Sequence, residues 1–396
     1  MRVLIAAASA STAISGVQRH ALNVARCLLS RPEISAVHFV VAPWQRDMMK
    51  KSGLYPNARL HVHLGEMQQG TFSRNRWYYK GLPALADRLD AEIVHLSYPV
   101  PVDARSFHCP TVVTLHDLYP YEIPMNFGFP HVLFNRLILQ QCLRSVDAVA
   151  VVSSVTGRRL KDYAPKTVWP KSVHIPNCVE ADPHSALESP LPGWTGEPFL
   201  LCVAQHRRNK NIPLLLRAFH RLLQSEAIVR NTRLVLVGIE GPETPLIRRV
   251  VASLKLGKNV LELQGLSEPD LQWCYRNCET VLAPSVTEGF GLPVAEALLA
   301  GTRVVCSDIP AFRELGEGHC RFVRLEGNSE AVLADAILAS LHDSAQEPVL
   351  LPQFSTAAIA GQYLDLYRGL VVAASSLNAA ELNVPAHVPS TERRYL

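Results

Sequence analysis

The sequence predicts an α/β protein with two doubly wound parallel sheets. The chain has 396 residues, of which 48% are hydrophobic, and this length exceeds what one hydrophobic core usually supports. Short apolar runs alternate with helical segments, which is typical of parallel strands covered by helices on both faces. The runs form two series separated by a stretch rich in proline. Two Rossmann-like domains are therefore expected.

The first series predicts the strands of an N-terminal domain over residues 1–180. Its apolar runs lie at 3–7, 38–42, 93–96, 111–115 and 148–153. The run at the N-terminus is too short for a signal peptide and leads directly into a polar loop, so it is interpreted as the first strand.

The second series predicts a C-terminal domain over residues 199–353. Its runs lie at 199–204, 233–238, 260–263, 280–285 and 303–308. Between the two series, residues 181–198 contain four prolines and two glycines and are predicted to be the linker. Apolar residues at helical spacing predict a C-terminal helix over 354–373, and the Ala-, Ser- and Pro-rich residues 374–396 are predicted to be a disordered tail.

Composition excludes several functional classes. The net charge of +4 is unevenly divided along the chain. Residues 1–180 have 20 Lys and Arg against 12 Asp and Glu, which gives +8, and the remainder has 19 against 23, which gives −4. This excess predicts that the first domain meets an anionic surface or substrate, but no nucleic-acid-binding motif accompanies it. No apolar stretch approaches the roughly 20 residues needed to span a bilayer. The nine cysteines, an odd number, are expected to be reduced thiols of a cytoplasmic enzyme.

Residues 284–301 place two carboxylates around a turn that opens a predicted helix. Gly289 and Gly291 relax the backbone of the turn, and Pro293 suits the first helical turn. Glu288 lies just before the turn and Glu296 lies one helical turn inside the helix. The two carboxylates can therefore accept hydrogen bonds from hydroxyls on either side of a bound phosphate, although Glu296 could also be a simple first-turn carboxylate.

The start of this helix is a predicted phosphate site. Unpaired amide groups and the helix dipole together favour an anion there. The amides concerned belong to Gly289, Phe290, Gly291 and Leu292.

The spacing from Glu288 to Glu296 resembles the E-x7-E signature of retaining glycosyltransferases of family 4 (glycosyltransferase group 1), which include bacterial mannosyl- and glucosyltransferases. The resemblance implies the GT-B architecture, in which two Rossmann-like domains face a central cleft. The resemblance implies that Glu288 binds the hydroxyls of the transferred sugar and that Glu296 binds the ribose of the nucleotide. It also implies that the C-terminal helix crosses back onto the first domain.

Lys210 follows the first strand of the second domain, beside a predicted helix N-terminus. A cation is electrostatically misplaced there unless an anion lies nearby, and the resemblance assigns this lysine to the diphosphate. The family usually has an arginine about five residues earlier, where this chain has Gln205. Arg207 or Arg208 is expected to supply that second positive charge. A solvated basic loop is the alternative.

His116 and Asp117 follow an apolar strand of the first domain, at the carboxyl edge where open α/β sheets bind ligands. The resemblance places His116 beside the transferred sugar, whereas a packed or capping histidine is the alternative. Asp117 is expected to anchor the loop. Gly16, in a loop that resembles the Gly-Gly-Val-Glu-Arg loop of the family, is expected to let the backbone approach the donor or the acceptor.

A cluster of cations and aromatic residues in the first domain suits either acceptor recognition or a membrane interface. Packing of the aromatic rings against the domain core is the equal alternative. The cluster consists of Arg74, Arg76, Trp77, Tyr78, Tyr79 and Lys80.

The expected function is transfer of a hexose from a nucleotide-diphosphate sugar to a hydroxyl of a saccharide, lipid-linked or small-molecule acceptor. The resemblance favours GDP-mannose, with a UDP-sugar otherwise, and implies retention at the anomeric carbon. No Asp-x-Asp pair occurs, so we expect no metal, and we expect no cofactor because the nucleotide sugar is a substrate. A cytoplasmic location is expected, with peripheral contact to the inner face of the membrane. A sugar-nucleotide epimerase and a catalytically silent scaffold are the alternatives.

Overall fold

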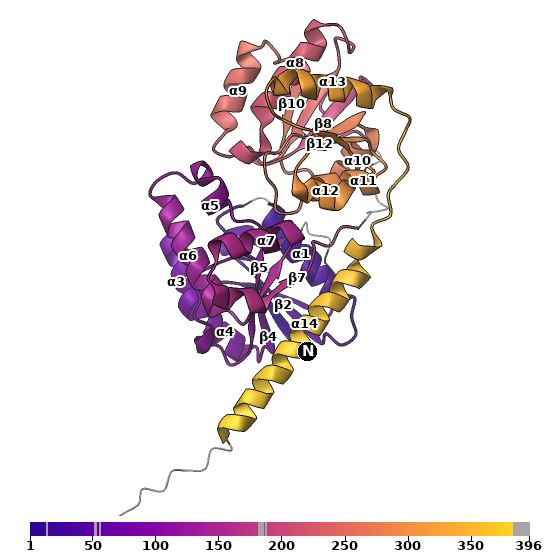
Figure 1. Ribbon diagram of the computed structural model, residues 1–396. Coiled ribbons are helices and arrows are strands. Elements are labelled where there is room, and N and C mark those ends of the chain that lie inside the picture. The colour runs from indigo at the N-terminus through magenta and orange to yellow at the C-terminus, as the bar shows by residue number, and fades with distance from the viewer. Residues whose placement is uncertain (13–14, 51–53, 55–56, 181–185, 187, 383–396) are drawn as a thin grey trace, which may run out of the picture.

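The computed structural model describes residues 1–12, 15–50, 54, 57–180, 186 and 188–382. It contains two sheets in which every strand pairing is parallel, each flanked by helices (Figure 1). This confirms the predicted α/β fold with two Rossmann-like sheets.

The first sheet has seven strands. They are β1 (Arg2–Ala6), β2 (Ala36–Val41), β3 (Leu60–Leu64), β4 (Ile93–Leu96), β5 (Thr111–Leu115), β6 (Ala148–Val151) and β7 (Ser172–His174), in the order β3-β2-β1-β4-β5-β6-β7. The second sheet has six strands. They are β8 (Phe199–Val203), β9 (Arg233–Val237), β10 (Val260–Leu263), β11 (Thr280–Ala283), β12 (Val304–Ser307) and β13 (Arg321–Val323), in the order β10-β9-β8-β11-β12-β13.

All ten predicted strands are present, with ends within two residues of the expected ones. The sequence analysis missed β3, β7 and β13. All three are edge strands, and an edge strand is partly solvated, so its sequence lacks a continuous apolar run. β3, for example, reads Leu-His-Val-His-Leu, and β7 and β13 have only three residues each.

Helices cover both faces of each sheet. The first domain has α1 (Gly16–Leu29), α2 (Arg46–Lys50), α3 (Thr71–Arg76), α4 (Leu82–Arg88), α5 (Tyr119–Glu122), α6 (His131–Ser145) and α7 (Ser154–Tyr163). The second has α8 (Ile212–Gln224), α9 (Thr244–Ser253), α10 (Glu268–Asn277), α11 (Leu292–Leu299), α12 (Pro310–Gly316) and α13 (Ser329–His342), and α14 (Thr356–Leu382) follows. Successive β1 residues enter different cores, since Val3 and Ile5 pack on one face and Leu4 on the other. Burial on both faces is why the central strands read as continuous apolar runs.

The last helix returns to the first domain, where it runs alongside α1 (Figure 1). Its residues Ile359, Tyr363 and Tyr367 are buried in the same core as Val3 and Ile5. The helix continues to Leu382, so the prediction that residues 374–382 belong to a disordered tail is wrong. This segment is rich in alanine, the strongest helix former. Residues 383–396 lie outside the described part of the chain, as do 181–185 and 187 of the predicted linker.

Candidate active site

The loop between β11 and α11 has the predicted form. Gly291 precedes the helix with a φ of +105°, and α11 begins at Leu292 with Pro293 in its first turn. Gly301, with a φ of +74°, follows the end of the helix. No hydrogen bond from the amides of Gly289 or Gly291 occurs within the part of the chain that the structure describes. These amides therefore form a donor set suited to an anion.

Glu288 is at the centre of a buried polar cluster in this loop. Its Oε1 accepts a hydrogen bond from Lys210 Nζ at 2.5 Å and another from the Ser285 hydroxyl at 2.7 Å. The side chains of Lys210 and Glu288 are 18% and 9% exposed, so the ion pair is largely desolvated. The structure brings together Lys210, expected at the diphosphate, and Glu288, expected at the sugar hydroxyls, although they are 78 positions apart.

The first domain completes this cluster through Tyr119. Its hydroxyl donates to Glu288 Oε2 at 3.2 Å and accepts from Asn209 Nδ2 at 3.1 Å. Asn126 Nδ2 in turn donates to Asn209 Oδ1 at 3.2 Å. Burial, and then the charge of Glu288, raise the pKa of Tyr119 well above its ordinary value. Tyr119 therefore stays a neutral hydrogen-bond donor to Glu288.

Gly289 lies directly against the first domain. A Cβ atom at this position would stand 1.8 Å from the carbonyl oxygen of His116. The Thr156 hydroxyl lies 3.3 Å from the Gly289 oxygen and 3.4 Å from the His116 oxygen. The absence of a side chain at Gly289 thus permits the close contact between the two domains.

His116 lies at the end of β5, at the carboxyl edge of the first sheet. Its Nε2–H donates to the Ser97 carbonyl at 2.9 Å, which leaves Nδ1 as the acceptor of the neutral ring. Burial lowers the pKa of His116 to about 4. Asp117 Oδ1 accepts from the Tyr119 amide at 3.0 Å and thereby holds the loop. Burial raises the pKa of Asp117 to about 6.

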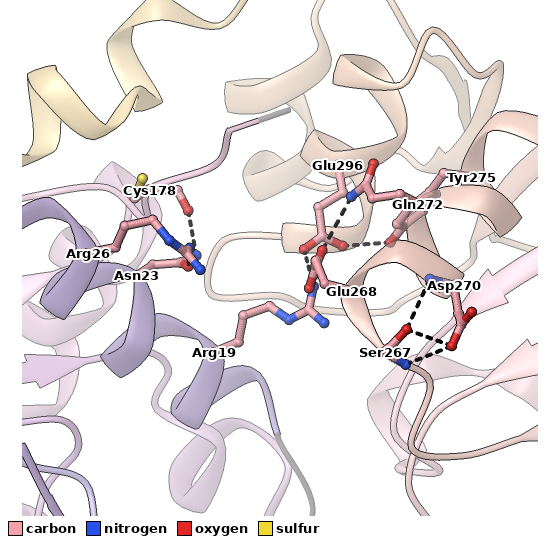
Figure 2. Close-up of polar contacts among 10 residues, drawn as sticks. All are labelled: Arg19, Asn23, Arg26, Cys178, Ser267, Glu268, Asp270, Gln272, Tyr275 and Glu296. Atoms are coloured by element: carbon pink, nitrogen blue, oxygen red, sulfur yellow. Dashed lines mark hydrogen bonds and ion pairs between the residues drawn. The ribbon is translucent and has the colours of Figure 1, made fainter. Parts of the chain in front are cut away.

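Glu296 is also buried, at 9% exposure. Its two oxygens each accept one hydrogen bond, from Arg19 Nη1 at 3.0 Å and from the Tyr275 hydroxyl at 2.7 Å. Arg19 comes from α1 of the first domain (Figure 2). The second carboxylate of the motif thus also lies where the domains meet.

The two arginines before Lys210 have different surroundings. Arg208 is exposed. Arg207 is partly buried, its Nε donates to Gln205 Oε1 at 2.8 Å, and its charge acts on Asp117. Of the two arginines, Arg207 is therefore the one whose charge acts on a residue of the first domain at the candidate site.

The structure divides the predicted cluster at 74–80. Trp77 and Tyr78 are buried in the core of the first domain, and the Tyr78 hydroxyl donates to the Ala8 carbonyl at 2.7 Å. For Tyr78, which is fully buried, the alternative of packing against the core holds, whereas Trp77 packs in the core and also lines the cavity described below. Tyr79 is exposed. Arg76 and Lys80 line a cavity of about 290 Å³ on the first domain, which is separate from the Glu288 cluster.

Among the described residues, Arg74 and Gly16 make no hydrogen bond or ion pair with Glu288 or Glu296. Arg74 lies near Tyr98. Burial raises the pKa of Tyr98, and the positive charge of Arg74 only partly offsets this rise. Gly16 starts α1, and open space surrounds the position that its Cβ would take.

Sequence reasoning missed several residues that hold the site together. Tyr119, Asn126 and Asn209 lie in short helical turns between longer elements, and Arg19 and Tyr275 lie on longer helices, where such side chains usually face solvent or the core. Arg19 follows Gly16 by three positions within the loop that resembled the family, and this was the one available signal.

Among the described residues, no group of three or more His, Cys, Asp or Glu side chains could hold a metal ion. In the same part of the chain, no helix is long and apolar enough to cross a membrane.

Comparisons with known proteins match both halves of the chain to family models. Residues 14–182 match the model described as Glycosyltransferase Family 4, and residues 190–351 match Glycosyl transferases group 1. O-antigen chain mannosyltransferase B of Escherichia coli is 29% identical over 59% of this chain and 61% of its own length. Phosphatidyl-myo-inositol mannosyltransferase of Mycobacterium leprae is 24% identical over 92% of this chain and 96% of its own length. The first three curated relatives are matched over 47% to 61% of their own lengths.

Solved structures share the fold. Sucrose-phosphate synthase from Thermosynechococcus elongatus is 17% identical, with a TM-score of 0.65 over 96% of this chain and 98% of its own. Anabaena HepE in complex with UDP and glucose is 15% identical, with a TM-score of 0.60 over 96% of this chain and 99% of its own.

Proposed function

The chain belongs to the family 4 (group 1) glycosyltransferases with the GT-B fold, since its two halves match the models of that family, and on this premise we propose that it transfers a hexose from a nucleoside-diphosphate sugar to an acceptor hydroxyl. The observation that carries this proposal is the buried Lys210–Glu288 pair at the start of α11. A lysine beside free helix amides suits a diphosphate, and a carboxylate beside it suits the hydroxyls of the attached sugar.

The proposed donor is GDP-mannose. Support comes from the names of the relatives, several of which are mannosyltransferases. UDP-sugars are the second group of donors to test, because a structural neighbour was solved with UDP. The acceptor is a saccharide, a lipid-linked saccharide or a small molecule that bears a hydroxyl.

The proposed reaction retains the configuration at the anomeric carbon and uses no metal. The acceptor oxygen attacks from the face on which the diphosphate leaves, and a phosphate oxygen takes the acceptor proton. Lys210, Arg207 and the amides before α11 supply the positive potential that stabilises the departing diphosphate. His116 faces the transferred sugar as a neutral ring that can accept a hydrogen bond through Nδ1.

A panel of nucleotide sugars with candidate acceptors tests the proposal. The expected result is acceptor-dependent release of nucleoside diphosphate and an α-linked product from an α-linked donor. Conversion of the nucleotide sugar into its epimer without transfer would favour the epimerase alternative. Absence of both binding and turnover with every donor would refute the proposal.

We further propose that the enzyme works in the cytoplasm and meets the inner face of a membrane through α6 and the loop before it. Support comes from large apolar side chains that are exposed there, namely Met125, Phe129, Leu133, Phe134 and Leu137. Residues 123–146 include no Asp or Glu, and the first domain carries a charge of +8 over residues 1–180. An apolar helix face on a cationic domain suits an anionic leaflet.

Sedimentation with anionic and neutral liposomes tests this contact. The native chain is expected to sediment with anionic liposomes and a Phe129→Ser, Leu137→Ser variant is expected to remain in solution. An Arg74→Glu, Arg76→Glu variant is the comparison, because it changes the charge of the first domain at a place other than α6. Equal sedimentation of the native and serine variants would exclude α6 as the contact.

A further inference from the structure

Arg19 reaches from the first domain to two carboxylates of the second. Its Nη1 lies 3.0 Å from Glu296 Oε1 and 3.1 Å from Glu268 Oε2 (Figure 2). Arg19 lies in the first turn of α1, Glu268 begins α10, and Glu296 is inside α11. This ion pair therefore joins three helices across the boundary between the domains.

The contact leaves part of the Glu296 carboxylate available. Arg19 occupies one oxygen and the Tyr275 hydroxyl occupies the other. A carboxylate has about four lone-pair sites, so each oxygen can accept one further hydrogen bond. Two vicinal ribose hydroxyls can use these sites while Arg19 and Tyr275 fix the orientation of the carboxylate.

The charge of Glu296 depends on its neighbours. Burial raises the pKa of Glu296 above the ordinary value. The positive charge of Arg19 is the largest effect that opposes this rise. Glu268 also raises the pKa of Glu296, whereas the hydrogen bond from Tyr275 lowers it. For Arg19, burial alone would lower the pKa, but the charges of Glu296 and Glu268 outweigh it and the pKa is raised. Arg19 thus stays charged and favours the ionised form of Glu296.

The residue one helical turn after Arg19 contacts the end of the first domain. This residue is Asn23, whose Nδ2 donates to the carbonyl of Cys178 at 3.0 Å, just before the linker begins. Arg26 Nη1 donates to Asn23 Oδ1 at 2.7 Å (Figure 2). The Arg26 side chain is exposed. The helix therefore contacts both Cys178, near the end of the first domain, and the second domain itself.

Separation of the domains would remove the cation from Glu296. The carboxylate would then remain next to Glu268, and two neighbouring carboxylates disfavour ionisation of both. An uncharged carboxyl is a poorer acceptor for ribose hydroxyls than a carboxylate. The affinity for a nucleotide should therefore depend on whether the first domain is in place.

We propose that Arg19 is a positioning residue for the donor: from the first domain it holds the Glu296 carboxylate ionised and oriented for the ribose, and so couples nucleotide binding to the approach of the two domains. This inference rests on the proposed function of Glu296 in donor binding. Coupling between sites is reciprocal, so a bound nucleotide also stabilises the contact between the domains.

The test compares four proteins: the native chain, Arg19→Met, Arg19→Lys and Glu268→Gln. A fifth, Arg26→Met, is the matched control, since it removes one positive charge from an exposed position on the same helix. Binding of UDP, GDP and ADP is measured by calorimetry from pH 5 to pH 9. The ratio of each variant's Kd to the native Kd cancels the titration of the nucleotide itself.

Arg19→Met should bind its preferred nucleotide about tenfold to 100-fold more weakly at pH 7, which is the loss expected for a hydrogen bond to a charged group. The loss should shrink as the pH rises, because Glu296 without Arg19 ionises only at higher pH. Arg19→Lys should retain most of the affinity. Glu268→Gln should keep its affinity to lower pH than the native chain, and Arg26→Met should match the native chain throughout.

Three outcomes would overturn the inference: native affinity in Arg19→Met, an equal loss at every pH, or a loss in Arg19→Lys as large as in Arg19→Met. If Arg19→Met does not fold, an unchanged pH dependence in Glu268→Gln would count against the inference in the same way. Failure of the native chain to bind any of the three nucleotides, together with no transfer, would instead contradict the proposed function.

Discussion

The Lys210–Glu288 pair offers a way to separate catalysis from stability. Replacing Lys210 by Met leaves the Glu288 carboxylate buried without its cation, and breaking a buried ion pair costs about 3–5 kcal/mol. Glu288 keeps the hydrogen bonds from Ser285 and Tyr119, so we expect the lower value, about 3 kcal/mol. For a domain of this size, that corresponds to a fall in melting temperature of about 6–12 °C.

The effect on turnover should be separate from this loss. Removal of a preorganised positive group at the departing diphosphate is expected to lower kcat by about 10²–10³-fold, or about 2.7–4 kcal/mol. In the double variant Lys210→Met, Glu288→Gln, the buried position is neutral, so most of the melting temperature should return. Turnover should remain as low as in the single variant, because neither the diphosphate nor the sugar hydroxyls regain their partner.

The assay measures release of nucleoside diphosphate at saturating donor, alongside calorimetric melting. Arg233→Met is the control, because Arg233 pairs with the buried Glu197 at the amino end of β9. This variant should lose stability and keep its turnover. Recovery of turnover in the double variant, or native turnover in folded Lys210→Met, would refute the catalytic role of the pair.

Three further results are expected. Gly289→Ala should lose most transfer activity, because its Cβ would stand 1.8 Å from the His116 carbonyl oxygen and force the domains apart; solution scattering should show a larger radius of gyration, and an unchanged profile with native activity would contradict the close contact. Asp117→Asn should be stabilised relative to the native chain as the pH rises, because burial raises the pKa of Asp117 from 3.8 to about 6, so the native chain loses stability across that interval; a melting difference independent of pH between 4 and 7 would exclude this cause. Chelation with EDTA should leave turnover largely intact, because Lys210 and the helix amides supply the positive potential; abolition by EDTA and restoration by Mg²⁺ or Mn²⁺ would overturn metal independence.

The sequence by itself determined the local chemistry of the site. Gly291, Pro293 and Gly301 specify a strand, a turn and a helix through their backbone preferences, which act over a few residues. The same holds for the nine interior strands, since burial on both faces requires continuous apolar runs. The carboxyl edge of a parallel sheet then fixes where such loops gather. Glu288, Lys210 and His116 could therefore be proposed before the structure was known.

Only the tertiary structure decided which side chains meet across the domain boundary. Tyr119 meets Glu288 over 169 positions, and Arg19 meets Glu296 over 277. Nothing in the local sequence records such contacts, because they depend on the relative orientation of two separately folded sheets. The same reason explains the cluster at 74–80, where alternation of cations and aromatic rings could not tell which rings turn inward. Burial in the core assigns Tyr78 to structure, and contact across the domains assigns Arg19 to the site.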